Sequence, residues 1–209
     1  MKISEKKHLA IVEAAKQEFI EYGFSSANMD RLCTAAGVSK RTLYRHFQSK
    51  EVLFTAVLQA IYKENVQSVS YVFHPEQTLL VQLCSIIEDE IHTLHYRYGI
   101  PLSRMILKEF LANPELAKHY LDAIYDNDNI LQNWITEAIQ HGRIANSTNT
   151  ELASSLLSNL FHGQFFWPQI VAHRPLPEAA EQQKKIYTIA EMFIRMFAKD
   201  PEKELLTTR

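Results

Sequence analysis

The chain has 209 residues, of which 46% are hydrophobic and 22% are charged, and its formal net charge is −2 at pH 7. This composition is ordinary for a globular protein, while only five glycines and seven prolines disfavour an all-β chain rich in tight turns. No apolar run resembles a signal peptide or reaches the roughly 18 residues of a membrane span, so we expect a cytoplasmic protein without a membrane partner.

The first 36 residues predict two helices. Apolar residues recur on one face over residues 4–22, and Gly23 follows as a stop. Asn28 is a good N-cap for a second helix over residues 28–36. Gly37 follows it, where a residue tolerant of positive φ is needed for a sharp turn.

A third, short helix is predicted from Lys40 to Phe47, with Ser39 as its cap and Val38 packed against Leu43 as a hydrophobic staple. At roughly 100° per residue, Leu43 and Phe47 share one side and anchor the helix. This is too little apolar surface for a helix that serves packing alone. The other side chains form a cationic and aromatic face made of Arg41, Thr42, Tyr44, Arg45 and His46.

Two short helices joined by a tight turn are typical of a helix-turn-helix reader of double-stranded DNA. Arginine forks pair with guanine edges, and the flanking groups reach phosphates. Lys50 begins the next helix after the Ser49 cap, where the helix N-terminus and the ammonium both favour a phosphate. The predicted DNA contacts are Asn28, Ser39, Lys40, Arg41, Thr42, Tyr44, Arg45, His46 and Lys50.

The charge is divided unevenly along the chain. Residues 1–50 hold nine lysines and arginines against five acids, a balance of +4 that leaves −6 for the remainder. This division fits a basic reading head on an acidic body that repels DNA.

The segment GVSKRTLYRHFQSKEVLF resembles the recognition segment of the TetR/AcrR family of transcriptional regulators, and AAKQEFIEYGFSSANMDRLCTAA is similar to that family's first two helices. The resemblance covers roughly residues 5–55, and it implies a one-component regulator, a repressor, that binds a DNA operator. The positions that carry it are Phe19, Gly23, Phe24, Gly37, Val38, Leu43, Tyr44, His46, Phe47, Lys50 and Leu53.

Six further helices are predicted, which gives an all-α fold of about nine helices, a three-helix helix-turn-helix domain on a helical bundle. Their ranges are 51–72, 76–96, 101–111, 114–141, 150–172 and 178–199. Gly142 is predicted as a left-handed cap, and Thr148 or Thr150 as an N-cap. We expect residues 1–50 to bind DNA, residues 51–200 to sense a ligand and dimerise, and residues 201–209 to form a flexible tail.

The last two predicted helices are apolar over wide arcs, and Gly163 permits close helix approach. Two such helices from each of two chains form a four-helix, two-fold interface, so we expect a homodimer. A dimer also suits a pseudo-palindromic operator with half-sites roughly 34–36 Å apart, or a multiple of that spacing. The expected interface residues are Leu156, Leu160, Gly163, Trp167, Ile186 and Phe193.

The body segments KEFLANPELAKHYLDAIYDN and GQFFWPQIV resemble the AcrR/AefR-like branch of the family. The resemblance implies a small-molecule effector, of unknown identity, that changes the spacing of the DNA-binding heads. An aromatic-rich helical body can enclose a mostly apolar pocket, although core packing also explains the same residues. The candidate lining is Met105, Phe110, Tyr125, Trp134, Phe161, His162 and Phe165.

A helical enzyme or metal-binding bundle with an incidental basic N-terminus is the competing hypothesis, and a DNA-binding architectural protein that senses nothing is a third. Glu88, His92 and His95 could share a helix face, but HExxH and nucleotide-binding motifs are absent from the sequence. The cysteines, Cys33 and Cys84, are too few for a zinc site, and we expect both reduced and buried. We therefore predict no metal, no cofactor and no enzymatic activity.

Overall fold

The computed structural model describes residues 3–65, 70–118 and 130–206, and these residues form α-helices, one π-helix and no strand. The all-α prediction is therefore confirmed. Packing divides the described chain into two compact units. The head unit contains residues 3–65 and 101–118, and the body unit contains residues 70–100 and 130–206. The expected functional boundary after residue 50 stays a prediction, since these units are defined by packing alone.

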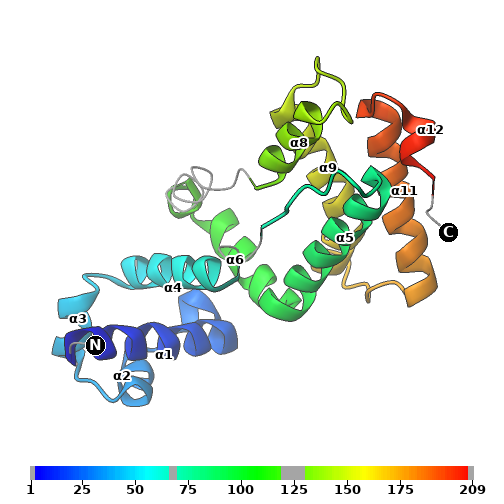
Figure 1. Cartoon of the computed structure of the whole chain (residues 1–209). Helices are drawn as coiled ribbons and strands as arrows, with labels where there is room; N and C mark the ends of the chain where they lie inside the picture. Colours follow the sequence, from blue (N-terminus) through cyan, green and yellow to red (C-terminus); the bar gives the residue numbers. More distant parts are fainter. Residues whose placement is uncertain (1–2, 66–69, 119–129, 207–209) are drawn as a thin grey trace. The chain divides into compact units, whose positions relative to one another are not determined.

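Four consecutive helices begin the head unit (Figure 1). They are α1 (Ile3–Ser26), α2 (Met29–Ala36), α3 (Lys40–His46) and α4 (Lys50–Asn65). Both α2 and α4 pack against α1. Gly23, with φ 77° and ψ 165°, kinks α1 at the predicted stop, and one more turn follows. The rings of Phe19, Phe24 and Phe54 form a cluster beside this kink, with the centroids of Phe24 and Phe54 4.9 Å apart.

A buried carboxylate joins α1 to the start of α2. Glu18 is 7% exposed, and it accepts hydrogen bonds from the backbone N–H of Asn28 at 2.7 Å and from Nε of Arg31 at 3.2 Å. Burial alone raises the pKa of Glu18, but the hydrogen bonds from Arg31 and Asn28 and the nearby cations outweigh it, so its pKa lies below the ordinary 4.5. We call these three residues the Glu18 clasp.

The head unit also contains most of α6 (Ile100–Ala112), which buries Leu102, Met105 and Glu109. Residues 114–118 are helical as well. The predicted helix over 114–141 then crosses residues 119–129, which lie outside the described residues.

Four helices of the body unit surround one apolar core. They are α5 (Leu79–His92), α8 (Ile130–Gln140), α9 (Thr150–Phe165) and α11 (Ala179–Phe197). The π-helix η1 (Thr93–Tyr98) continues α5, and His95 on it lies 2.9 Å, Nε2 to O, from the backbone carbonyl of Phe165 at the end of α9. Two four-residue helices, α10 (Trp167–Ile170) and α12 (Pro201–Glu204), complete the unit.

Several helix ends differ from the prediction. α4 is described as far as Asn65, residues 66–69 lie outside the described residues, and residues 70–73 are not helical, so the predicted helix does not extend to residue 72. The predicted helix over 150–172 breaks at Phe166, one residue before α10, whose first turn holds Pro168. Its N-cap is Asn149, whose Oδ1 accepts from the N–H of Leu152 at 2.9 Å, instead of Thr148 or Thr150. The left-handed cap at Gly142 is confirmed, with φ 68°.

The predicted flexible tail contains α12, which is fastened to the body unit by its last residue. Glu204 is 2% exposed and accepts hydrogen bonds from Nε and Nη2 of Arg143 and, at 2.8 Å, from the backbone N–H of Leu79. Arg143 also donates to the carbonyls of Pro75 and Gln77, at 2.8 and 2.9 Å. The sequence pattern missed this contact because it joins segments far apart in the chain.

Both cysteines are free, and burial raises the pKa of the Cys84 thiol to about 11. No helix within the described ranges is long and apolar enough to cross a membrane.

Removing the Glu204 carboxylate should destabilise the body unit strongly. We expect Glu204→Ala to lower its free energy of unfolding by about 3–5 kcal/mol, because the half-buried Arg143 guanidinium is left without its partner. Both tryptophans, Trp134 and Trp167, lie in the body unit, so tryptophan fluorescence in a urea titration reports this unit. Glu202→Ala, which removes an exposed acid from the same short helix, is the control and should change the free energy by less than about 0.5 kcal/mol. Equal effects of the two variants would contradict the structural role of Glu204.

The Glu18 clasp should show a defined pH dependence. A carboxylate with a lowered pKa in the folded state contributes stability above its unfolded pKa and loses it as the pH falls through the folded pKa. We expect Glu18→Gln to weaken the protection of α2 amides against hydrogen exchange by about 1–3 kcal/mol at pH 6. The difference from wild type should shrink below pH 4.5, the unfolded value. Glu13→Gln, at an exposed acid of α1, is the control, and a difference independent of pH would contradict the assignment.

Candidate nucleic-acid interface

The start of α2 and the turn between α2 and α3 have the predicted caps. Oδ1 of Asn28 accepts from the N–H groups of Asp30 and Arg31, at 2.7 and 3.3 Å. Gly37 is left-handed, with φ 62° and ψ 36°, a conformation that glycine adopts at little cost. Oγ of Ser39 accepts from the N–H of Thr42 at 3.2 Å and lies 3.0 Å from the Thr42 hydroxyl. These local bonds set where α3 begins.

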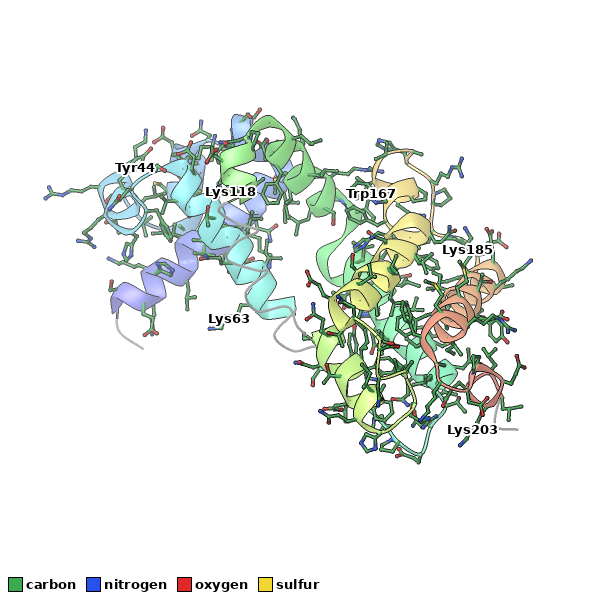
Figure 2. All side chains as sticks on the ribbon, turned by 90° about the horizontal axis from the view of Figure 1, so that it is seen from above. Tyr44, Lys63, Lys118, Trp167, Lys185 and Lys203 are labelled. Carbon is green, nitrogen blue, oxygen red and sulfur yellow. The ribbon has the colours of Figure 1, made fainter. Side chains whose placement is uncertain are left out.

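The two sides of α3 differ as predicted. Leu43 is 1% and Phe47 3% exposed, so these side chains anchor the helix in the head unit. Arg41 and Arg45 are exposed, and Tyr44, 44% exposed, projects from the surface (Figure 2). The exposed side of α3 therefore carries two guanidinium groups and a phenol, which suit base edges and phosphates.

The cations of α2, α3 and the start of α4 fall into two groups. The ammonium of Lys40 lies 2.9 Å from the carboxylate of Asp30, and Arg31 is held by Glu18. Lys50 donates to the carbonyls of Ser25 and Ala27 at 3.2 and 3.1 Å, so most of its hydrogen-bonding capacity is directed to the end of α1. Within the described residues, Arg41 and Arg45 have no ion-pair partner. The two arginines are therefore the cations of α3 that are free to contact DNA.

His46 has a different environment from the one we expected. It is half-buried, its ring lies 5.9 Å from that of His8, and its buried Nε2 has no hydrogen-bond partner among the described residues. Burial lowers the pKa of His46 below its ordinary 6.5, and the nearby charges of Arg45, His8 and Lys7 lower it further. The lowered pKa favours the neutral imidazole of His46, which does not suit a cationic contact with phosphate.

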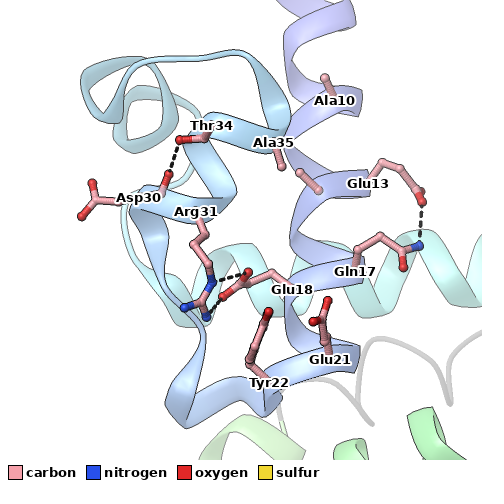
Figure 3. Close-up of a pocket in the computed structure, with 11 residues that line it drawn as sticks. Ala10, Glu13, Gln17, Glu18, Glu21, Tyr22, Asp30, Arg31, Thr34 and Ala35 are labelled. Carbon is pink, nitrogen blue, oxygen red and sulfur yellow. Dashed lines mark hydrogen bonds and ion pairs between the residues drawn. The ribbon is translucent and has the colours of Figure 1, made fainter.

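A groove that we did not predict lies between α1 and α2 (Figure 3). Its volume is about 950 Å³, and alanines from both helices line it together with Arg31 and four acids. Figure 3 shows Arg31 turned toward Glu18 at one end. The acids are Glu13, Glu18, Glu21 and Asp30. The groove shares no residue with the predicted effector lining, and its negative charge disfavours DNA phosphate.

The predicted effector lining is divided between the two units. Trp134, Phe161 and Phe165 are buried in the core of the body unit, and His162 lies beside them on α9, with Nδ1 2.7 Å from the carbonyl of Ser158. Met105 and Phe110 lie on α6, in the head unit, and Tyr125 is outside the described residues. An effector site built from all seven residues stays a prediction.

Two of the predicted interface residues need correction. Ile186 and Phe193 are 0% and 1% exposed because they pack in the core of their own body unit, so they cannot present a surface to a second copy. By contrast, Leu156 and Leu160 are half-buried, Gly163 is exposed, and Trp167 is 47% exposed (Figure 2).

The metal hypothesis has no geometric support. Glu88 accepts a hydrogen bond from Gln183, the ring of His92 lies against that of Tyr96, and His95 is bonded to Phe165. No group of three or more metal-ligating side chains occurs in the part of the chain that the structure describes.

Comparison with known proteins covers both units. Residues 11–57 match the family model for bacterial regulatory proteins of the tetR family, and residues 81–199 match the C-terminal domain of AefR-like transcriptional repressors. The HTH-type transcriptional regulator UidR of Escherichia coli K12 is 28% identical over 161 residues, which are 73% of this chain and 76% of UidR. The fatty acid metabolism regulator protein of Bacillus subtilis is 22% identical over 158 residues, 75% of this chain and 80% of that protein.

Solved structures agree with these matches. The structure of a TetR family regulator from Pseudomonas syringae pv. tomato is 29% identical to this chain in sequence and has a TM-score of 0.76. The match covers 92% of this chain and 97% of that regulator. The Flavonoid-responsive Regulator FrrA is 25% identical, with a TM-score of 0.75, and the match covers 93% of this chain and 98% of FrrA. With family models matched across both the reading head and most of the body, the chain belongs to the TetR family of bacterial transcriptional regulators.

Proposed function

We propose that this chain is a cytoplasmic, homodimeric repressor that binds a pseudo-palindromic operator and leaves it when the body binds a small molecule. The observation that carries the proposal is the division of α3 into a buried side, with Leu43 and Phe47, and an exposed side whose two arginines have no ion-pair partner among the described residues. An exposed pair of guanidinium groups on a short, well-anchored helix suits the major groove, where arginine forks recognise guanine edges.

The effector half of the proposal concerns the body unit. The body unit has an aromatic core, which favours apolar ligands, and FrrA is named for its response to a flavonoid. A ligand shifts the DNA-binding equilibrium only if it binds one arrangement of the two heads more tightly than the other.

The dimer is proposed on a revised surface. Nζ of Lys185 on α11 donates to Oε1 of Gln164 on α9 at 3.1 Å, which places that side of α11 beside α9. Met192 and Met196 lie on the same side of α11 and are 45% and 57% exposed. Together with Trp167 at the start of α10 and four residues of α9, namely Leu152, Leu156, Leu160 and Gly163, they form a partly apolar surface, which we call the α9–α11 face. Such a face fits a two-fold, four-helix contact.

The two exposed arginines should carry operator binding. We expect Arg41→Ala with Arg45→Ala to abolish binding at moderate salt, since each lost contact to a base edge costs about 1–3 kcal/mol. The measurement is a gel shift at fixed salt, with the DNA upstream of the chain's own coding region as the probe. Arg174→Ala with Lys184→Ala removes the same charge from exposed positions of the body unit and should leave binding unchanged. Unchanged affinity of the Arg41 and Arg45 variant would refute the assignment of α3.

A charge placed on the α9–α11 face should separate the protomers. We expect Met192→Glu to shift the protein from dimer toward monomer, as measured by sedimentation velocity. In a two-fold interface each protomer contributes one new carboxylate, so the dimer would have to bury two of them. Tyr187→Glu is a matched control on another side of the same helix, with 43% exposure against 45% for Met192. A dimer that survives Met192→Glu, or one lost equally in both variants, would count against this face.

A further inference from the structure

The first cation of α3 is engaged by an acid of the preceding helix. Lys40 begins α3, Asp30 lies in the first turn of α2, and their charged groups are 2.9 Å apart. Both side chains are exposed, 54% for Lys40 and 71% for Asp30, so DNA can reach either of them. The hydrogen bond that Lys40 donates to Asp30 raises the pKa of Lys40, in agreement with a stabilised ammonium.

Carboxylate and phosphate are both oxyanions, and they compete for the same ammonium. Phosphate contacts supply nearly all the affinity of a regulator for DNA of arbitrary sequence. A lysine that must leave an internal carboxylate before it binds phosphate contributes less to that affinity than a free lysine does. An exposed ion pair of this kind corresponds to a factor of about two to five in an equilibrium constant.

The neighbouring contacts make Lys40 the position where this competition occurs. Arg31 is held by the buried carboxylate of Glu18, and Lys50 is directed to backbone carbonyls. Arg41 and Arg45, by contrast, are not engaged by any acid among the described residues. Lys40 therefore combines a DNA-facing position with a partner that is weak and accessible enough to exchange.

We propose that Asp30 is an intramolecular competitor of DNA phosphate for Lys40, and that it limits the sequence-independent part of DNA affinity. This inference rests on the proposed DNA-binding function of α3. Asp30 does not touch DNA in this account, and it acts only through Lys40.

A double-mutant cycle on full-length protein tests the proposal. The probe is a fluorescent duplex of arbitrary sequence, and binding is followed by anisotropy at one fixed salt concentration, because phosphate contacts are salt-dependent. We expect Asp30→Asn to tighten binding about two- to five-fold for each head that contacts DNA. In a Lys40→Gln background the same change should have no effect beyond that of removing one negative charge.

That charge effect is measured with Glu13→Gln. Glu13 is an exposed acid on α1 whose carboxylate accepts from Gln17, and it is not bonded to α3 among the described residues. The proposal is overturned if the Asp30→Asn variant binds DNA no more tightly than the Glu13→Gln variant. It is also overturned if Asp30→Asn tightens binding equally in the wild-type and Lys40→Gln backgrounds. Thermal unfolding by circular dichroism verifies that each variant folds, and Asp30→Ser replaces Asp30→Asn if the latter does not. Failure of wild type to bind any duplex, including the upstream DNA, refutes the proposed function and this inference together, whereas normal wild-type binding with no Lys40 dependence refutes the inference alone.

Discussion

The packing of Leu43 and Phe47 into the head unit is the constraint on which the DNA-binding surface depends. α3 has only seven residues, and an isolated helix of that length is not stable in water. It persists because two side chains are buried on one side while Gly37 and Ser39 fix its start. Because Leu43 and Phe47 anchor α3 on one side, the other side does not need to pack against the protein, and two arginines are exposed there.

The head unit also distributes its charges by role. Glu18 and Asp30 each engage one basic side chain, and the end of α1 engages Lys50 through its carbonyl oxygens. Lysines and arginines with the same formal charge therefore differ in whether they must leave an internal partner before they can contact DNA. A held cation must exchange partners, whereas Arg41 and Arg45 need only lose water. The net charge of a domain thus overstates the charge that is available for phosphate contacts.

Features of this fold that depend on neighbouring residues were predictable from the sequence, and features that depend on distant residues were not. The caps at Asn28, Gly37, Ser39 and Gly142 follow from the residue's own chemistry within a turn. Glu18 left a readable signal, since it lies on the apolar stripe of its helix, where an unpaired carboxylate would be costly.

Two other features had no such signal. Periodicity shows that α11 has a wide apolar arc. It does not show which residues of that arc pack in the core of the same chain and which are left for contact with a second chain. Ile186 and Phe193 were therefore assigned to the wrong surface, although the fold class was right. The contact of Glu204 with Arg143 and Leu79 joins residues that are up to 125 positions apart in the sequence, so no local sequence pattern predicts it.

That contact also has a consequence for the connection between the units. Residues 70–78 lead into α5, and their last part is bound by Arg143 at the carbonyls of Pro75 and Gln77, while Glu204 accepts from the N–H of Leu79 at the start of α5. A buried ion pair contributes little net stability once desolvation is counted, but it favours one geometry over others. His74 is held in addition by Gln82, whose side chain bonds both its N–H and its carbonyl at 2.9 Å and also accepts from Trp134. Because directional bonds to charged and amide groups fix residues 74–79 on the body unit, this end of the connection is not a free linker, and the Gln82 side chain that holds His74 is itself bonded to Trp134 in the body's core.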